Sequence, residues 1–178
     1  MHRKNRVDPQ GALLAVAARG TLMGNRGCLH DDGGHIVRQS ARDAWVTCLL
    51  SFKERQRQIM QPGHYTELFF LDEATALAAG HRPCSECRRE RYVAYQEAWA
   101  RVFGLERRPV AKDIDLQLKR DRSEPRENVV SDLKAIPAGQ SFGLTRPEIS
   151  IWFGTAGCIA GASTDMARPC RLPISAPL

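Results

Sequence analysis

The chain has 178 residues, 43% of them hydrophobic, and carries a formal net charge of +6 at pH 7. That length suits a single domain, and the hydrophobic content is enough for a buried core. No apolar run approaches the roughly 20 residues that a membrane-spanning helix needs, which argues against a membrane partner. The basic excess is consistent with DNA or another nucleic acid as a partner, and equally with an ordinary basic surface.

Six cysteines are spread along the chain and do not form the dense framework of a small secreted domain. Two of them make the C-x-x-C motif Cys84–Cys87, and the others stand alone: Cys28, Cys48, Cys158 and Cys170. Free thiols in this arrangement favour a reducing, cytoplasmic setting. The apolar stretch after the basic residues 1–6 is short, so we expect no secretory signal.

The first part of the chain offers turn chemistry and one pair of candidate ligands. Residues 1–9 are polar and expected to be loosely held, and residues 11–23 fit a short helix or a strand equally well. Closely spaced Asp and Gly residues predict a hairpin over residues 24–38. Cys28 and His30 would then point to the same side of a strand as candidate metal ligands, unless Cys28 is a core residue and His30 a surface one.

Two strands and a helix are predicted next. Residues 44–52 and 65–71 are rich in aromatic and aliphatic residues and are too short for helices. Cys48, in the first of these strands, is a candidate third ligand, and the alternative is a buried structural cysteine. Asp72 fits the N-cap of a helix that closes at Gly80, a residue suited to the left-handed conformation.

A second helix is expected to open near residues 83–85 and to present aromatic residues on one face up to Phe103. Cys84 and Cys87 would then lie at its N-terminus, where free N–H groups favour thiolate over thiol. Four nearby arginines act in the same direction: Arg82, Arg88, Arg89 and Arg91. Two thiolates at this spacing suit a metal ion, with zinc the best match, or a redox-active pair, or simply small buried residues.

The segment ATALAAGHRPCSECRRE resembles the end of the metal-binding module of the Ada family of methyl-phosphotriester repair proteins, over about residues 65–92. The resemblance implies a strand, a short helix, the motif A-A-G-x-R-P-C-x-x-C and a further helix, with Cys84 and Cys87 as two of four zinc ligands. The family takes its other two ligands from an upstream C-x-x-x-C, in which one cysteine accepts the methyl group. Residues 53–63 contain no cysteine, so methyl transfer is not implied for this chain. The longer pattern through GNRGCLH and YTELFFLDEA is similar to a group of bacterial proteins and implies no activity.

Beyond the second helix the expected elements are sparser. A basic amphipathic helix is predicted over residues 113–122 and a last strand over 149–153, followed by a flexible tail at 161–178. The whole pattern predicts an α+β fold with one domain over residues 1–160 and its core at about 24–104. We expect a small antiparallel sheet packed by two to three helices, with an Ada-like core.

The favoured hypothesis is a zinc-binding, nucleic-acid-associated protein in which the C-x-x-C pair fixes a basic helix. Its phosphate contacts would come from the four arginines along one edge: Arg82, Arg88, Arg89 and Arg91. An enzyme is the alternative, with thiol redox chemistry at the cysteine pair or a metal-dependent nuclease or hydrolase near His30 and the carboxylates of Asp31, Asp32 or Asp72. A purely structural protein-interaction module is the third. Neither a reaction nor an oligomeric state follows from the sequence.

Overall fold

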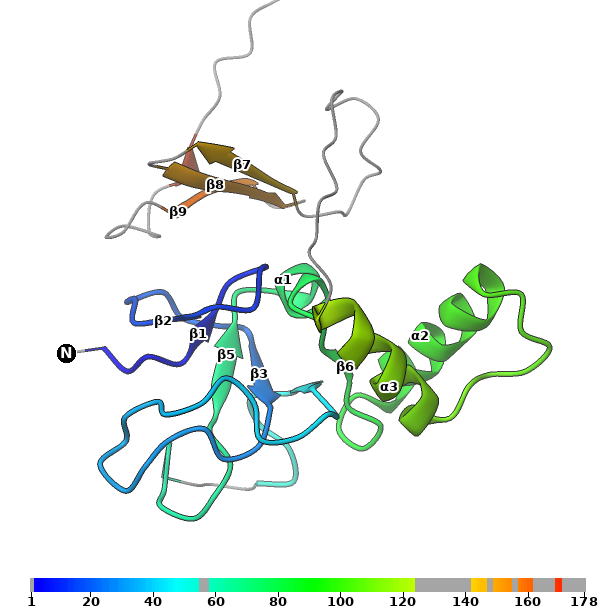
Figure 1. Cartoon of the computed structure of the whole chain (residues 1–178), viewed down its shortest axis with the longest axis horizontal. Helices are drawn as coiled ribbons and strands as arrows, with labels where there is room; N and C mark the ends of the chain where they lie inside the picture. The colour runs from blue at the N-terminus through cyan, green and yellow to red at the C-terminus, as the bar shows by residue number, and fades with distance from the viewer. Residues whose placement is uncertain are drawn as a thin grey trace, which may run out of the picture.

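The computed structural model describes residues 2–54 and 58–123 in full and, beyond them, the backbone of four further strands. Five strands come first: β1 (Arg6–Val7), β2 (Leu13–Leu14), β3 (Leu22–Asn25), β4 (Val46–Cys48) and β5 (Leu68–Phe70). They are followed by α1 (Glu73–Ala78), β6 (Arg82–Pro83), α2 (Arg89–Val102) and α3 (Ala111–Ser123). Figure 1 shows β1, β3 and β5 close together, with α2 and α3 to one side of them.

The first six strands form one mixed sheet in the order β2-β1-β5-β3-β4-β6. Strand β3 pairs antiparallel with β4 and β5, and β1 pairs antiparallel with β2. The β1–β5 and β4–β6 pairs are parallel. The α+β class is therefore confirmed, but the expected small antiparallel sheet is wrong in size and in strand direction. Strands β1 and β6, which form these parallel pairs with β5 and β4, have two residues each. Strands that short carry no period-two pattern from which to predict them.

Residues 5–8 are held in or beside the sheet, which corrects for them the expectation that residues 1–9 are loose. Val7 is 5% exposed and lies in the hydrophobic core. The side-chain amide of Asn5 donates to the carbonyl of Glu67 at 3.0 Å, and the N–H of Phe69 donates to the carbonyl of Asn5 at 2.9 Å. Asp8 orders the following turn by accepting from backbone N–H groups, including that of Ala12 at 2.8 Å. The polar composition of this segment reflects these hydrogen bonds and not a frayed end.

One face of the sheet packs on α1 and on the loop after β3. The core residues of this face are Val7, Leu13, Leu29, Leu68, Phe70, Ala76 and Ala79. Gly24 of β3 lies between Thr47 and Leu68 of the neighbouring strands, and a Cβ at this position would collide with the ring of Phe70. A glycine in this strand thus makes room for an aromatic residue of the core.

Helix α1 follows the prediction closely. The carboxylate of Asp72 accepts from the N–H of Thr75 at 2.7 Å and caps the helix. Gly80 has a φ of +79° and donates its N–H to the carbonyl of Leu77, so it closes the helix as expected. Only residues 79–81 separate α1 from β6, because the left-handed Gly80 turns the chain directly into that strand.

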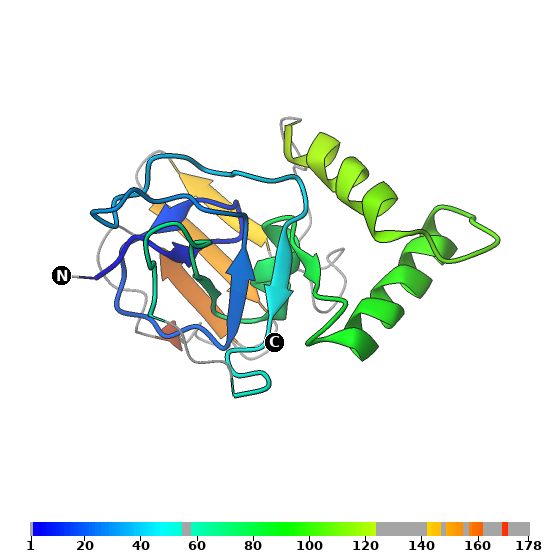
Figure 2. The same ribbon diagram turned by 90° about the horizontal axis from the view of Figure 1, so that it is seen from below.

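Helix α2 begins later than the sequence suggested. Pro83 belongs to β6, residues 85–88 form a turn, and the first helical residue is Arg89. The aromatic face of α2 is confirmed, since the rings of Trp99 and Phe103 stack with their centroids 5.0 Å apart. Figure 2 shows α2 and α3 as two consecutive helices beside the sheet.

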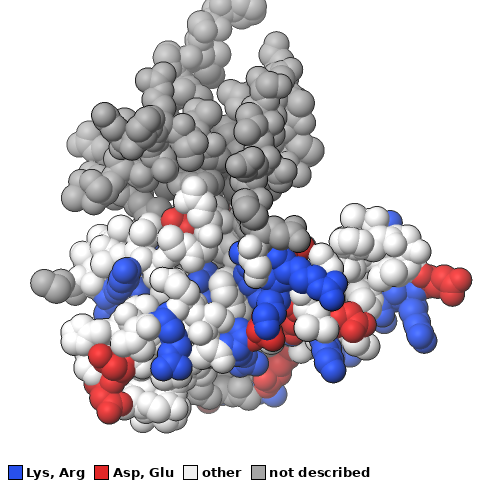
Figure 3. Space-filling model, viewed as in Figure 1, with Lys and Arg blue, Asp and Glu red and all other residues white. Residues whose placement is uncertain are grey.

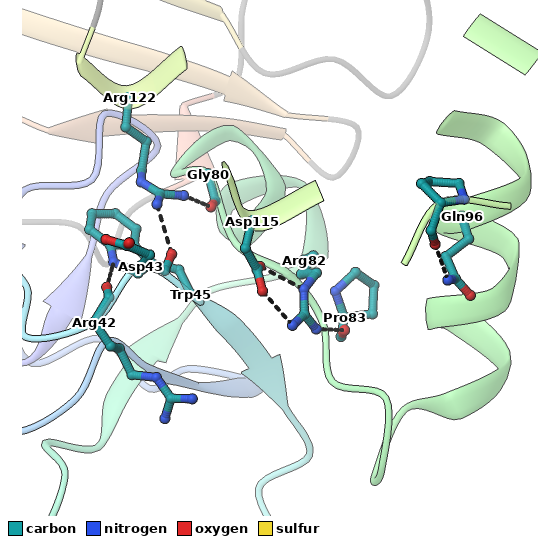
Figure 4. Close-up of polar contacts among 10 residues, drawn as sticks. Arg42, Asp43, Trp45, Gly80, Arg82, Pro83, Gln96, Asp115 and Arg122 are labelled. Atoms are coloured by element: carbon teal, nitrogen blue, oxygen red, sulfur yellow. Dashed lines mark hydrogen bonds and ion pairs between the residues drawn. The ribbon is translucent and has the colours of Figure 1, made fainter. Parts of the chain in front are cut away.

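Helix α3 is fastened to the sheet by ionic and polar contacts (Figure 4). The guanidinium of Arg82 donates to both carboxylate oxygens of Asp115, at 2.8 and 2.9 Å, and both residues are buried. Arg122 donates to the carbonyl of Gly80 at 2.9 Å and to that of Asp43 at 2.9 Å. The predicted amphipathic helix is therefore confirmed, with one of its carboxylates buried.

The four remaining strands form an antiparallel sheet of their own in the order β10-β9-β8-β7. They are β7 (Phe142–Arg146), β8 (Ile149–Gly154), β9 (Gly157–Gly161) and β10 (Pro169–Cys170). Strand β8 covers the predicted strand at 149–153, but β9 and β10 follow it. Most of the predicted tail, 162–168 and 171–178, lies outside the described residues. None of the helices described is long and apolar enough to cross a membrane.

Candidate metal centre

Two neighbouring parallel strands, β4 and β6, bring Cys48 and Cys84 together. Thr47 of β4 is the register partner of Pro83 of β6. Cys48 is the last residue of β4, and Cys84 directly follows β6. The N–H of Cys84 donates to the carbonyl of Thr47 at 2.9 Å, which fixes the chain beside Cys48. Residues distant in the sequence are thus placed together by ordinary strand pairing.

The turn after β6 returns the third cysteine to the same place. The N–H of Arg88 donates to the carbonyl of Cys84 at 3.2 Å and closes the turn. The N–H of Glu86 points to Cys84 Sγ at 3.4 Å. As a result the Sγ atoms of Cys48, Cys84 and Cys87 all lie within 4.8 Å of one another. The structure therefore shows a cluster of three half-buried cysteines that can hold a metal ion.

The spacing of these sulfur atoms is close to that of a thiolate metal site. In a tetrahedral zinc site with bonds of about 2.3 Å, two sulfur ligands are about 3.8 Å apart. The three Sγ atoms lie within 4.8 Å of one another, so only a small inward movement of the side chains would bring them to the spacing of a zinc site. The four cysteines whose side chains are described, Cys28 included, are free thiols, so no disulfide competes for these atoms.

The three thiols have very different proton affinities. Hydrogen bonding from Cys48 and from the backbone N–H groups of Cys87 and Glu86 lowers the pKa of Cys84 to about 5, against the opposing effect of burial. The hydrogen bond with Cys84, burial and the charge of Cys84 raise the pKa of Cys48. Burial and the charge of Cys84 also raise the pKa of Cys87, which the N–H of Leu49 partly offsets. Without a metal these opposite shifts favour the thiolate form at Cys84 and the thiol form at Cys48 and Cys87.

The cysteines form part of the wall of a pocket of about 500 Å³. This pocket lies on the sheet face opposite the core, because Met23, Cys48 and Phe69 are cross-strand partners on β3, β4 and β5 and all three line it. The remaining wall is apolar or acidic: Leu49, Leu50, Phe52, Ile59, Tyr65, Glu67 and Glu86. A metal ion held by the three sulfurs would therefore lie at the edge of an open cavity.

Glu67 is the pocket residue that sequence reasoning missed. It is 5% exposed, and its Oε2 accepts from the N–H of Met60 at 2.7 Å. The signal was present in the predicted strand at 65–71, where alternation places Tyr65, Glu67 and Phe69 on one face. A carboxylate between two aromatic residues on one strand face is unusual for a buried surface and would have pointed to a polar site.

Cys28 and His30 lie outside the cluster. Cys28 Sγ contacts the carbonyl of His30 at 3.6 Å. His30 is buried and uses both ring nitrogens within the fold, on the hydroxyl of Thr66 at 2.6 Å and the carbonyl of Gln61 at 3.3 Å. These contacts give His30 a structural role, and within the described part of the chain the only group of potential ligands is the cysteine cluster.

Three of the four predicted phosphate-binding arginines form ion pairs within the fold, although the side chain of Arg91 is 61% exposed. Arg82 is paired with Asp115, and its guanidinium also lies 5.3 Å from the ring centre of Tyr92. Glu73 of α1 binds two more: Arg88 donates to it at 2.6 Å, and Arg91 donates to both of its oxygens. The fourth, Arg89, is exposed at the start of α2. Arg82 therefore joins β6 to α3, and Arg88 and Arg91 join the start of α2 to α1, so three of the four arginines are ion-paired within the fold.

Two of the three carboxylates considered for a nuclease, Asp31 and Asp72, have structural roles. Asp31 accepts from the N–H of His35 at 2.8 Å within the turn before Ile36, and this hydrogen bond lowers the pKa of Asp31. Asp72 caps α1. In Figure 3 the Lys and Arg side chains of the visible face occur in several separate places, with acidic residues beside the largest group.

Comparison with known proteins adds no assignment: no family model, no curated protein and no solved structure matches the chain. The likeness of residues 65–92 to the Ada-type module therefore remains a prediction from the sequence. The cysteine cluster and the pocket beside it are the features of the described residues that bear on function.

Proposed function

We propose that the protein binds a zinc ion through the thiolates of Cys48, Cys84 and Cys87. The observation that carries the proposal is the convergence of three sulfur atoms from β4, from the end of β6 and from the turn before α2. Thiolate ligands in a reducing environment favour Zn²⁺ over Mg²⁺ and Ca²⁺, which prefer oxygen. A bound ion would join β4 to β6 and hold the start of α2, so its first role is to fix the surrounding structure.

Metal analysis of the purified protein tests this proposal. We expect one zinc per chain after purification without chelator, and thiol titration should reveal the three cluster thiols only after zinc is removed. Cys84→Ser and Cys48→Ser should each reduce zinc content strongly, because two remaining thiolates hold zinc weakly. Cys28→Ser is the matched control and should leave zinc content unchanged. Zinc below about 0.1 per chain, or equal content in all variants, would exclude the site.

A thiol redox function is the second candidate, and the lowered pKa of Cys84 favours it. A thiolate in a C-x-x-C pair is a good nucleophile and can form a disulfide with its neighbour. The two functions differ in what chelation does. Zinc binding predicts thiols that are masked until the metal is removed, whereas a redox pair predicts reversible disulfide formation between Cys84 and Cys87 with no metal present. Mass spectrometry of alkylated peptides separates these outcomes.

Association with nucleic acid remains a prediction from the net charge alone. The ion pairs of Arg82, Arg88 and Arg91 count against the contact surface that the sequence suggested. Phosphate binding would have to come from other exposed residues, such as Arg89, and would weaken steeply with added salt. Titration of labelled duplex DNA at low and moderate salt measures this.

A further inference from the structure

We infer that the fourth coordination position of the metal opens into the adjoining pocket and takes a small ligand with an uncharged nitrogen donor and an apolar body. This inference rests on the zinc site proposed above. Within the described residues the cluster supplies three ligands and no fourth Cys, His, Asp or Glu joins them. A tetrahedral ion with three protein ligands keeps one position for water or an added molecule.

The pocket is the space into which that position can open. All three cysteines line it, and its volume of about 500 Å³ is in the range of sites for small molecules. Its rim carries large apolar side chains that are left in contact with solvent: Leu49 is 41% exposed, Leu50 52% and Ile59 41%. A bound molecule with an apolar body would cover these side chains and gain from their removal from water.

The charge of the pocket selects the donor. Three thiolates around a divalent ion leave a net charge of −1, and Glu67 adds a buried acidic group to the same wall, whereas Glu86 is paired with Lys53 at 3.6 Å. No described residue that lines the pocket is Lys or Arg, although the chain as a whole is basic. An anion such as phosphate would therefore meet repulsion in a partly enclosed site. A neutral nitrogen donor meets none, and the carboxylate of Glu67 can accept a hydrogen bond from an N–H of such a ligand.

Cobalt substitution tests the inference with two separate signals. Co²⁺ bound to the cluster gives thiolate-to-metal charge-transfer absorption, which reports the metal site itself. Its visible ligand-field bands report the fourth ligand. We expect imidazole, at about pH 8 where it is mostly uncharged, to shift the visible bands in a saturable way. Inorganic phosphate at the same concentrations should leave them unchanged.

Two variants tie the response to the pocket. Leu50→Trp fills the rim and should weaken imidazole binding by about tenfold or more with the charge-transfer absorption retained. Val37→Trp, at a residue 54% exposed that does not line the pocket, should behave as the wild type. Both positions are exposed, so neither change is expected to prevent folding.

The outcomes are distinguishable. Absence of charge-transfer absorption would overturn the metal site, and the inference with it. Charge transfer with no imidazole response, or a response to phosphate that equals it, would overturn the inference and leave the metal site standing. The same applies if Cys158→Ser or Cys170→Ser lowers the charge-transfer intensity, because a fourth cysteine would then close the site. An unchanged intensity in those two variants, with a saturable imidazole shift, supports it.

Discussion

At the scale of single residues, His81 shows how a buried polar group is held in this fold. It is 1% exposed, between the rings of Trp45 and Phe70, with centroid distances of 5.0 and 4.6 Å. Arg26 Nε donates to His81 Nε2 at 3.1 Å, so the imidazole is neutral with its proton on Nδ1. Nδ1 faces the carbonyls of Ala76 and Ala79 without a hydrogen bond of normal geometry. Protonation would place a second cation directly against Arg26.

This arrangement predicts a loss of stability in mild acid. Burial, and then the charges of Arg26 and Arg122, lower the pKa of His81 well below its usual value of 6.5. Below about pH 6.5 the unfolded chain binds a proton at this residue that the folded protein does not. The contribution of His81 to stability is therefore complete above that pH and is lost as the pH falls, by up to about 1.4 kcal/mol per pH unit.

Urea denaturation at a series of pH values between neutrality and about pH 5 measures this slope. His81→Gln keeps an acceptor for Arg26 and does not titrate, so the free energy of unfolding should depend less steeply on pH than in the wild type. His64→Gln, at an exposed histidine, is the control and should keep the wild-type slope. Equal slopes in His81→Gln and the wild type would show that His81 does not bind protons differently in the two states.

At the same scale, the sequence identified more of the candidate site than its local signals alone would suggest. Cys84 and Cys87 were recognisable from their spacing, and Cys48 from its place on a strand preceding the central one. Which lone cysteine joins the pair depends on strand pairing across the sheet, and one sequence does not contain that information in a local form. For this reason Cys28 and Cys48 both remained candidates, and the pairing of β4 with β6 is what brings Cys48 to Cys84 and Cys87.

At the scale of elements, helix α3 depends on one buried ion pair. Arg82 of β6 and Asp115 of α3 have side chains only 7% and 11% exposed, and the hydrogen bonds between them are bidentate. Breaking a buried pair by removing one partner leaves a charge without compensation. Since Arg82 also lies two residues before Cys84, this contact links the packing of α3 to the strand that carries the site.

Asp115→Asn is therefore expected to destabilise the protein by about 3 kcal/mol, the low end of the range for such changes because the amide oxygen can still accept from Arg82. Asp113→Asn, two residues earlier in the first turn of α3 and exposed, should cost less than about 1 kcal/mol through the helix dipole alone. Urea denaturation gives both values. Similar effects of the two substitutions would mean that the buried pair contributes no more than a surface charge.

Elements with strong local signals were predicted well, and those without were not. The N-cap Asp72 and the left-handed Gly80 defined α1 within a residue or two. The late start of α2 was missed because Pro83 suits both a first helical turn and the edge of a sheet, and the choice is made by the pairing of β6 with β4. A parallel strand of two residues is decided by its neighbours and not by its own composition.

At the scale of the whole molecule, the net charge was a poor guide to where charged groups lie on the surface. A net charge of +6 suggested a basic binding edge, yet the arginines beside the cysteines are paired with Glu73 and Asp115. The partners come from α1 and α3, so the pairing could not be read from the arginine-rich segment itself. The described lining of the pocket, by contrast, includes Glu67 and Glu86 and no Lys or Arg, although Lys53 pairs with Glu86, so net charge and local charge are separate properties.

The stability of the whole fold should depend on the metal. An ion that binds the folded protein and not the unfolded chain stabilises it by RT ln(1 + [L]/Kd), about 2.7 kcal/mol when free zinc is 100 times Kd. The short strands β4 and β6 share few backbone hydrogen bonds, so a cross-link at their ends would contribute much of the cohesion on this side of the sheet. We expect the midpoint of thermal unfolding to rise with free zinc and to fall when a chelator is added.

The cysteine variants separate this linkage from a general effect of zinc on the chain. In Cys48→Ser the dependence of the midpoint on zinc should largely disappear, because the ligand from β4 is lost. Cys28→Ser removes a thiol of similar burial that lies outside the cluster and contacts the carbonyl of His30, and its midpoint should follow zinc as in the wild type. If both variants respond equally, zinc binds elsewhere. If neither the wild type nor the variants respond, the sulfur cluster holds β4 and β6 together only through its hydrogen bonds.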